Sequence, residues 1–352
     1  MHLKKRTIDS HIHIGNWFCE DGGDYVQRCD ALQQALGLDG FCIDCVSDPV
    51  YGNVENNIMA ALYKLHNPTA YANGAIVYAS YPIQLPFGEG VDPLTQYEEL
   101  MEIGLDGMKI LYKPDVQKIK QLPIDHEVYE PVFAQMEKDG THITWHVADP
   151  EEFWDARTGR KWDYSDGTYP SYESMMEQTL RVMEKHPQLK VTFAHFMFLS
   201  KHPEMLEELF EKYPNLAVDV TPGTEMYTSF TEQRDFYRGF FEKYAHRILF
   251  GSDVEIPLRR HSVNEELVRS VYQAMTEDCE VSIWKLPARG LELSDASCNL
   301  ILRENFLRRS GNKPKNVNVA ALKRYIQKYL PLIKNPKSKE QILKKFEELE
   351  RW

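Results

Sequence analysis

The chain has 352 residues, of which 43% are hydrophobic and 27% are charged, and its formal net charge is −12. This length and composition fit a globular protein with one large α/β barrel or two smaller domains. The negative charge argues against nucleic acid or an anionic membrane surface as the main partner, although a small anionic substrate can still meet a locally positive site.

Neither a targeting segment nor a disulfide scaffold is expected. No apolar stretch follows the basic N-terminal residues, and no run is long enough to span a membrane. The six cysteines are too few for a disulfide scaffold in a chain of this length. Cys42 and Cys45 lie in a predicted strand, where positions three apart face opposite ways. We therefore expect a cytoplasmic protein.

Short β-like runs alternate with amphipathic helical stretches, which is typical of a parallel sheet with crossover helices. We predict strands at 7–15, 40–46, 71–78, 107–111, 142–147, 190–195, 216–220 and 247–252. We predict helices at 25–36, 56–65, 94–103, 126–139, 172–186, 203–213, 230–244 and 265–276. Eight alternations predict an α/β fold, a (β/α)8 TIM barrel.

Helical patterns continue beyond the eighth unit, at 294–309 and in two stretches between 319 and 352. They are more than a barrel needs to close, so we predict a helical C-terminal appendage that packs on the barrel. The predicted division is a barrel over 1–310 and a C-terminal extension over 311–352.

Two histidines mark the first strand, in the sequence T-I-D-S-H-I-H-I-G. His11 and His13 project from the same face, because residues i and i+2 of a strand do so. Neutral imidazoles are good ligands for zinc and related metals. Taken alone, the pair is equally compatible with ordinary strand histidines that have hydrogen-bond partners.

Four more polar residues lie in or directly after predicted strands, as this pair does. Lys109 lies in the fourth predicted strand, and the fifth, sixth and eighth strands end near His146, His195 and Asp253. The separation of His13 and His146 corresponds to about four β/α units of roughly 31 residues each. Because active sites of TIM barrels form at the C-terminal strand ends, these side chains are predicted to converge on one site.

With these pieces the sequence resembles the amidohydrolase superfamily, specifically its "amidohydrolase 2" group. That group includes aminocarboxymuconate-semialdehyde decarboxylase, resorcylate-type decarboxylases and several lactonases. The matching motifs are I-D-S-H-I-H-I-G, G-M-K-I-L, T-W-H-V, F-A-H-F and I-L-F-G-S-D, which span roughly residues 1–310. The motifs point to the superfamily and the fold, and they do not fix the reaction.

The resemblance implies that His11, His13, His146 and Asp253 bind one divalent ion, with Zn²⁺ as the expected metal. Asp253 would also act as the general base for a metal-activated water. His195 would polarise a substrate carbonyl or orient the hydroxide, or else bind a second metal. For Lys109 we favour an unmodified side chain that binds a substrate carboxylate. The alternatives are a carbamylated lysine that bridges two metals and a barrel lysine paired with a carboxylate.

Other residues are candidates for substrate contacts. The segment 148–170 is rich in aromatic and cationic residues, including Trp154, and is either a lid or a loop that packs on its own aromatics. Trp17 follows the predicted metal strand, and Arg259 follows the eighth strand, where it would meet an anionic substrate. Asp219, on the seventh predicted strand, is a further candidate for the pocket.

Three functions remain open from the sequence. The leading one is a metal-dependent hydrolase that acts on a cyclic ester, amide or related bond of a small, carboxylated molecule. The alternative is a non-oxidative, metal-dependent decarboxylase of a small carboxylic acid. The third is a barrel that only binds a ligand, which the retention of every predicted metal ligand disfavours. The expected partner is a small-molecule substrate, and a homo-oligomer is left open.

Overall fold

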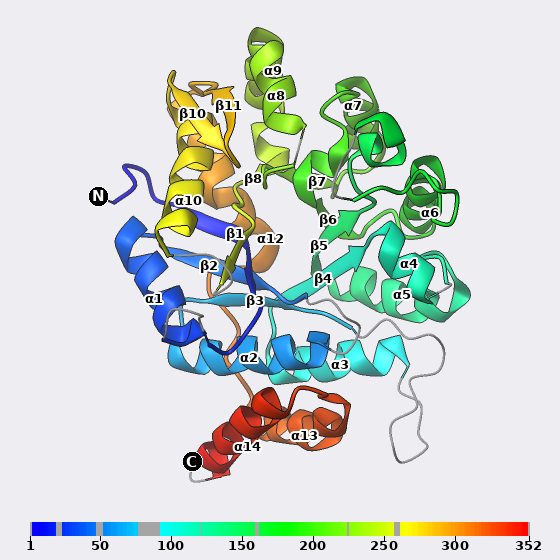
Figure 1. Cartoon of the computed structure of the whole chain (residues 1–352), viewed down its shortest axis with the longest axis vertical. Coiled ribbons are helices and arrows are strands. Elements are labelled where there is room, and N and C mark those ends of the chain that lie inside the picture. Colours follow the sequence, from blue (N-terminus) through cyan, green and yellow to red (C-terminus); the bar gives the residue numbers. More distant parts are fainter. Residues whose placement is uncertain are drawn as a thin grey trace.

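Parallel strands form the centre of the computed structural model, and helices surround them (Figure 1). The structure describes residues 2–18, 23–46, 52–76, 92–120, 122–158, 162–223, 225–256 and 261–350. Within these ranges one sheet has the strand order β8-β7-β6-β5-β4-β3-β2-β1-β9. Its strands are β1 (Ile8–Ile14), β2 (Gly40–Asp44), β3 (Tyr71–Gly74), β4 (Gly107–Tyr112), β5 (His142–Val147), β6 (Lys190–Phe193), β7 (Ala217–Asp219), β8 (Ile248–Leu249) and β9 (Val254–Ile256).

The first and last strands close the sheet into a barrel. β8 pairs with β7 and β9 pairs with β1, so the two short strands are parts of one interrupted eighth strand. Between them, the carbonyl of Phe250 accepts a hydrogen bond from Ser10 N (3.0 Å), and Asp253 N donates to the carbonyl of His11 (2.9 Å). The predicted TIM barrel is confirmed. The strand predicted at 247–252 is present but shorter, and the chain turns at Asp253, with φ of 58°, before it pairs again as β9.

Helices cover the outside of the barrel. They are α1 (Tyr25–Leu36), α2 (Gly52–His66), α3 (Pro93–Ile103), α4 (Pro114–Lys120), α5 (Glu130–Asp139), α6 (Tyr172–Lys185), α7 (Pro203–Lys212), α8 (Met226–Glu232), α9 (Arg234–Tyr244), α10 (His261–Thr276), α11 (Asp295–Asn299) and α12 (Asn305–Ser310). Local sequence sets their ends. In α1, for example, the Asp24 carboxylate caps the first turn by accepting from Gln27 N, and Gly37 ends the helix at φ of 67°.

The structure differs from the predicted helices in three places. The helix predicted at 230–244 is two helices, α8 and α9, because the backbone of Gln233 leaves the helical region. The helix predicted at 294–309 contains a π-helical turn, Leu300–Glu304, between α11 and α12. Helix α4 and a hairpin of β10 (Glu280–Ile283) and β11 (Leu286–Arg289) were not predicted.

Apolar side chains fill one end of the barrel and leave the other for polar groups. Two side chains of α12, Phe306 and Leu307, pack against the barrel interior. The strand residues of this cluster are Ile8, Cys42, Tyr71, Ala217 and Leu249. Because this cluster fills the N-terminal end of the barrel, the polar side chains at the C-terminal strand ends gather at the opposite end.

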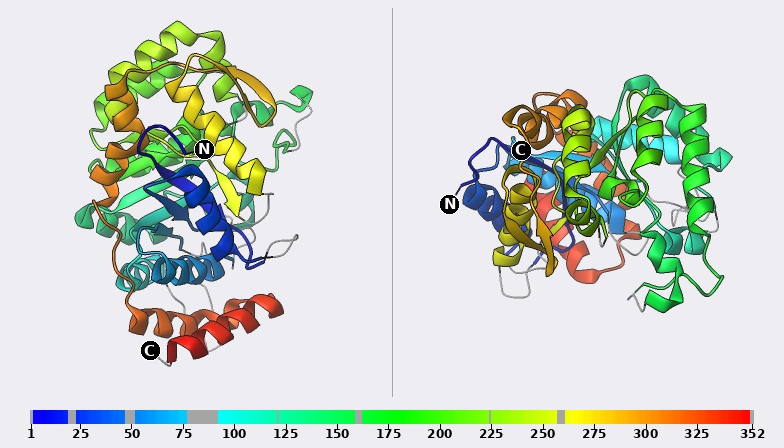
Figure 2. Two further views of the ribbon diagram at one scale, coloured as in Figure 1. Left: turned by 90° about the vertical axis from the view of Figure 1, so that its left-hand side faces the viewer. Right: turned by 90° about the horizontal axis from the view of Figure 1, so that it is seen from above.

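Two helices beyond the barrel, α13 (Val319–Tyr329) and α14 (Pro336–Glu350), lie along α2 and α3 (Figures 1 and 2). Asn57 Nδ2 of α2 donates to the hydroxyl of Tyr325 (2.9 Å), and Tyr329 donates to Glu99 Oε2 of α3 (2.6 Å). The predicted helical C-terminal region is therefore present, while its status as a separate unit over 311–352 stays a prediction. In the described part of the chain, every helix is too short or too polar to span a membrane.

Candidate metal centre

Strand β1 and the break in the eighth strand bring three predicted ligands together. His11 and His13 share a face of β1, and the turn at Asp253 directs its carboxylate toward them. Gly251 permits this close approach, because a Cβ at this position would lie 2.9 Å from the Cβ of His11. The interruption of the strand is therefore the feature that places Asp253.

The three side chains are spaced as ligands of one ion. His11 Nε2 lies 3.1 Å from His13 Nε2, and Asp253 Oδ1 lies 3.0 Å from His13 Nε2 and 3.8 Å from His11 Nε2. Ligands about 2.0–2.1 Å from a tetrahedral metal are roughly 3.3 Å apart. Among the residues that the structure describes, these three form the one group of histidine, cysteine or carboxylate side chains close enough to share an ion.

Hydrogen bonds fix the tautomers of both histidines. His11 Nδ1 donates to Asp219 Oδ2 (2.8 Å), and His13 Nδ1 donates to the backbone carbonyl of Asp44 (2.7 Å). Each ring therefore directs its Nε2 away from the hydrogen-bonded side, and both Nε2 atoms face the same point. This is the usual arrangement of metal-binding histidines, in which the second ring nitrogen binds a carboxylate or a carbonyl.

His146 and His195 form a second pair beside the first. His195 Nε2 lies 3.1 Å from His146 Nδ1, and the ring centroids of His11 and His195 are 5.8 Å apart. The remaining nitrogens donate to the carbonyls of Ala148 (3.1 Å) and Pro222 (3.0 Å). The structure thus brings three of the four predicted ligands into one group and places His146 with His195 at its edge.

Lys109 lies between His11 and a carboxylate. Its Nζ is 2.6 Å from His11 Nε2 and 3.3 Å from Asp44 Oδ2, and the residue is 1% exposed. This contact matches the interpretation of a barrel lysine paired with a carboxylate. Substrate binding by Lys109 and its carbamylation both stay predictions.

Burial keeps most of these imidazoles neutral. Burial lowers the pKa of His11 well below its ordinary value, and the Lys109 cation lowers it further. Burial also lowers the pKa of His146, and it lowers the pKa of His195 to about 4. Neutral imidazole is the form that binds metals.

His13 and Asp253 behave differently because they form an ion pair. Burial lowers the pKa of His13, but Asp253 outweighs this effect, and the net change is a rise. Burial opposes ionisation of Asp253, yet contact with His13 holds the pKa of that carboxyl well below its usual range. A divalent cation would displace the proton of this pair, and a negative carboxylate with two neutral imidazoles is a donor set that fits such a cation.

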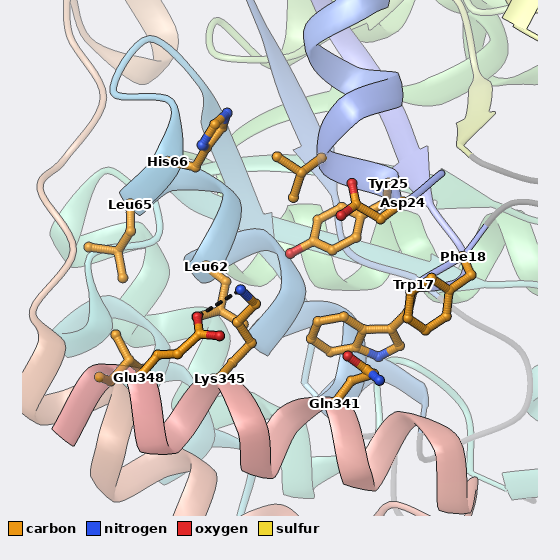
Figure 3. A pocket seen from close by; sticks show the side chains of 12 residues that line it. Trp17, Phe18, Asp24, Tyr25, Leu62, Leu65, His66, Gln341, Lys345 and Glu348 are labelled. Atoms are coloured by element: carbon orange, nitrogen blue, oxygen red, sulfur yellow. Dashed lines mark hydrogen bonds and ion pairs between the residues drawn. The ribbon is translucent and has the colours of Figure 1, made fainter. Parts of the chain in front are cut away.

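The other predicted contact residues lie elsewhere. Trp17 packs edge-on against Tyr25, with ring centroids 5.6 Å apart, and lines a cavity of about 500 Å³ between the barrel and α14 (Figure 3). Trp154 donates from Nε1 to the carbonyl of Pro170 (2.9 Å) and packs against Tyr164, as expected for a loop that packs on its own aromatics. Arg259 lies outside the described residues. Substrate contact by any of the three stays a prediction.

Several residues of the site were missed or only suspected from the sequence. Asp44 and Thr221 were missed, and Asp219 was a suspected pocket residue that the structure places directly against His11. Phe198 was also missed, although it stacks on His195 (5.1 Å between centroids) and meets His146 (5.3 Å). Asp219 carried a positional signal, because it lies near the end of a predicted strand as His146 does, whereas Asp44 lies inside the strand predicted at 40–46 and carried none.

The backbone around His195 is strained. Residues 195–198 all have positive φ, between 54° and 57°, in a run without glycine. Such conformations cost of order 1–3 kcal/mol each, and they cluster at functional sites. The strained turn places both His195 and Phe198 at the barrel mouth.

Comparison with known proteins identifies relatives of the whole barrel. The model of the amidohydrolase family matches residues 8–305. No curated protein matches the chain in sequence. Among solved structures, 2,6-dihydroxybenzoate decarboxylase from Rhizobium is 16% identical, with a TM-score of 0.52 over 86% of this chain and 98% of that one.

Two more solved structures share the fold. The 5-carboxyvanillate decarboxylase from Sphingomonas paucimobilis is 12% identical, with a TM-score of 0.52 over 87% of this chain and 98% of its own. A dihydroxybenzoic acid decarboxylase from Polaromonas sp. JS666, which contains manganese and 2-nitroresorcinol, is 14% identical, with a TM-score of 0.53 over 88% and 96%.

Proposed function

The chain belongs to the amidohydrolase family, and from that premise we propose that it is a metal-dependent lyase that releases CO2 from a small carboxylic acid. Hydrolysis, which the sequence favoured, becomes the second candidate. The three solved structures compared above are decarboxylases, and their likeness supports this order of the two reactions.

One apolar side chain, Phe198, lies beside His146 and His195. This apolar wall is the observation that carries the proposal. Phe198 is 6% exposed and contacts the rings of both His146 and His195. A substrate carboxylate held against this wall would lose its hydration. Its charge disperses as the C–C bond breaks, so a dry, apolar surface raises the energy of the ground state more than that of the transition state.

The residues around the wall can hold the metal and carry the proton. His11, His13 and Asp253 are proposed to hold a divalent ion, with His146 as a fourth ligand, and Zn²⁺ and Mn²⁺ both suit nitrogen and carboxylate donors. When bound, the ion supplies positive charge that stabilises the developing carbanion. In decarboxylation a proton replaces CO2 on the carbon atom. His195 Nε2, which is unprotonated because Nδ1 donates to the carbonyl of Pro222, is placed to take that proton from a water molecule and pass it to the carbon atom.

A different contact favours hydrolysis as the second candidate. Asp253 lies 3.0 Å from His13 and stays ionised, so it is placed to accept a proton from a water molecule at the same site. Hydrolysis would then add that water across an ester or amide bond. The small-molecule substrate, a cytoplasmic location and a homo-oligomer remain proposals in either case.

A panel assay separates the two reactions. The protein, loaded with Mn²⁺ or Zn²⁺, is incubated with hydroxylated aromatic acids and, separately, with lactones and amides. CO2 is measured by a bicarbonate-coupled assay and acid by a pH indicator, with the His13→Ala variant as the metal-site control. We expect CO2 release that the variant loses. Acid release from lactones or amides without CO2 from any acid would overturn the proposal.

A further inference from the structure

The chain turns back on itself directly after His146. Ala148 has φ of 53°, and this turn folds the next residue, Asp149, against the imidazole of His146. Asp149 Oδ1 lies 3.4 Å from His146 Nε2, and Asp149 is 8% exposed. A buried carboxylate therefore faces the ring nitrogen that points away from the metal centre.

The second oxygen of this carboxylate is held by a tyrosine from the aromatic loop. Tyr164 donates from its hydroxyl to Asp149 Oδ2 at 2.7 Å. The tyrosine is itself fixed, because its backbone N donates to the carbonyl of Phe153 (2.8 Å) and its ring packs against Trp154 and Tyr169 at centroid distances of 5.0 and 4.8 Å. Asp149 is thus held between His146 and a packed aromatic cluster.

We propose that Asp149 and Tyr164 are positioning residues that set the ring orientation and tautomer of His146. The inference rests on the proposed metal centre, to which neither residue contributes a ligand. With the proton of His146 on Nε2, facing Asp149 and the carbonyl of Ala148, the Nδ1 lone pair faces His195 and the centre. The opposite tautomer would point an N–H into the centre and could not bind a metal.

In this proposal the aromatic loop does more than pack against the barrel, because its Tyr164 hydroxyl orients Asp149. A tyrosine that only packed would work equally well without its hydroxyl. The hydroxyl of Tyr164, in contrast, satisfies the one carboxylate oxygen that His146 does not face, and holds Asp149 in the orientation that the imidazole needs.

The chain offers a matched control for the hydroxyl. Tyr172 also packs on Trp154 (5.7 Å between centroids), and its buried hydroxyl has no hydrogen-bond partner among the described residues. Tyr164→Phe and Tyr172→Phe therefore each remove one buried hydroxyl from the same aromatic cluster. Only the first removes a contact to Asp149. Asp149→Asn tests the carboxylate directly.

Two measurements test the proposal. Long-range ¹H–¹⁵N spectra of the metal-free protein report the tautomer of His146, and competition with a chelator reports the affinity for Zn²⁺ and Mn²⁺. We expect the Nε2–H tautomer in the unsubstituted chain and in Tyr172→Phe. We expect mixed tautomers and about 10–100-fold weaker metal binding in Asp149→Asn. Tyr164→Phe should show the same changes with a smaller loss of affinity, because the carbonyl of Ala148 still accepts from Nε2.

Different results of these measurements would refute the positioning role and the proposed function. Thermal melts first show that the phenylalanine variants fold alike. If Asp149→Asn and Tyr164→Phe match Tyr172→Phe in both tautomer and affinity, the positioning role is refuted. If the unsubstituted chain binds neither metal, the proposed function fails, and the tautomer spectra of the metal-free protein still decide whether Asp149 and Tyr164 position His146.

Discussion

Replacing Asp219 by asparagine tests whether His11 is held ready to bind a metal. The carboxylate is fully buried, and it accepts from His11 Nδ1 (2.8 Å), from His195 N (2.9 Å) and from Thr221 N (3.1 Å). Asparagine preserves the shape but removes the charge and turns one acceptor into a donor. The variant therefore loses its preference for the tautomer that leaves His11 Nε2 free.

The size of the effect follows from these contacts. Loss of a carboxylate that orients a metal-binding histidine costs about 10–100-fold in metal affinity, which corresponds to about 1.4–2.7 kcal/mol. A buried donor without an acceptor costs a further 1–3 kcal/mol or so in the free energy of unfolding. Chelator competition measures the first quantity, and urea unfolding of the metal-free protein measures the second.

Asp106 supplies the control for a buried carboxylate. It pairs with Lys64 between α2 and β4, away from the metal centre. Asp106→Asn breaks that buried pair and should cost about 3–5 kcal/mol of stability, while the affinity for metal stays unchanged. If Asp219→Asn binds metal as tightly as the unsubstituted chain, or if Asp106→Asn loses affinity by the same factor, the reasoning is refuted.

Three further predictions concern the ligands, the barrel closure and pH. His13→Ala and Asp253→Asn should each lose bound metal in elemental analysis, and an unchanged metal content in both would contradict the ligand assignment. Gly251→Ala should lower the free energy of unfolding by about 1–3 kcal/mol, since the added Cβ would meet His11 at 2.9 Å; an unchanged urea midpoint would count against this. Burial lowers the pKa of His142 well below 6.5, so below that pH the unfolded chain takes up a proton that the folded chain does not. Its contribution to stability is present above pH 6.5 and is lost as the pH falls. The free energy of unfolding should therefore depend differently on pH in the unsubstituted chain and in His142→Asn between about pH 5 and 7.5. The same pH dependence in both would contradict the prediction.

The barrel and half of the site follow from periodicity in the sequence. Strand and helix units of nearly constant length place every strand end on the same face, so His11, His13 and Asp253 meet although they come from opposite ends of the barrel sequence. Periodicity does not report the break in the eighth strand. That break depends on the turn at Asp253, whose φ of 58° is allowed only because the surrounding barrel holds it.

The residues of the site that were not predicted resemble ordinary buried strand residues in the sequence. Asp44 lies in F-C-I-D-C-V, where nothing in the spacing distinguishes it from a buried strand residue. Its role becomes visible only when β2 pairs with β1, since its carbonyl then meets His13 and its carboxylate meets Lys109. For Trp17, closeness in sequence says little about surroundings. It is four residues from His13 in the chain, yet it lines the cavity between the barrel and α14.

The buried charges around His11 connect the number of metal ions to the chemical state of Lys109. Three carboxylates, Asp44, Asp219 and Asp253, face the two β1 histidines, and the Lys109 ammonium supplies one positive charge. With both histidines neutral, as metal binding requires, two negative charges remain, which one divalent ion neutralises. A carbamylated lysine would turn that positive charge into a negative one, leave four negative charges and require a second divalent ion. Because uncompensated buried charge is costly, one ion should accompany an unmodified lysine, and two ions a lysine carrying added CO2. Metal content and intact mass measured on the same sample test this coupling, and a carbamylated chain with a single ion would disprove it.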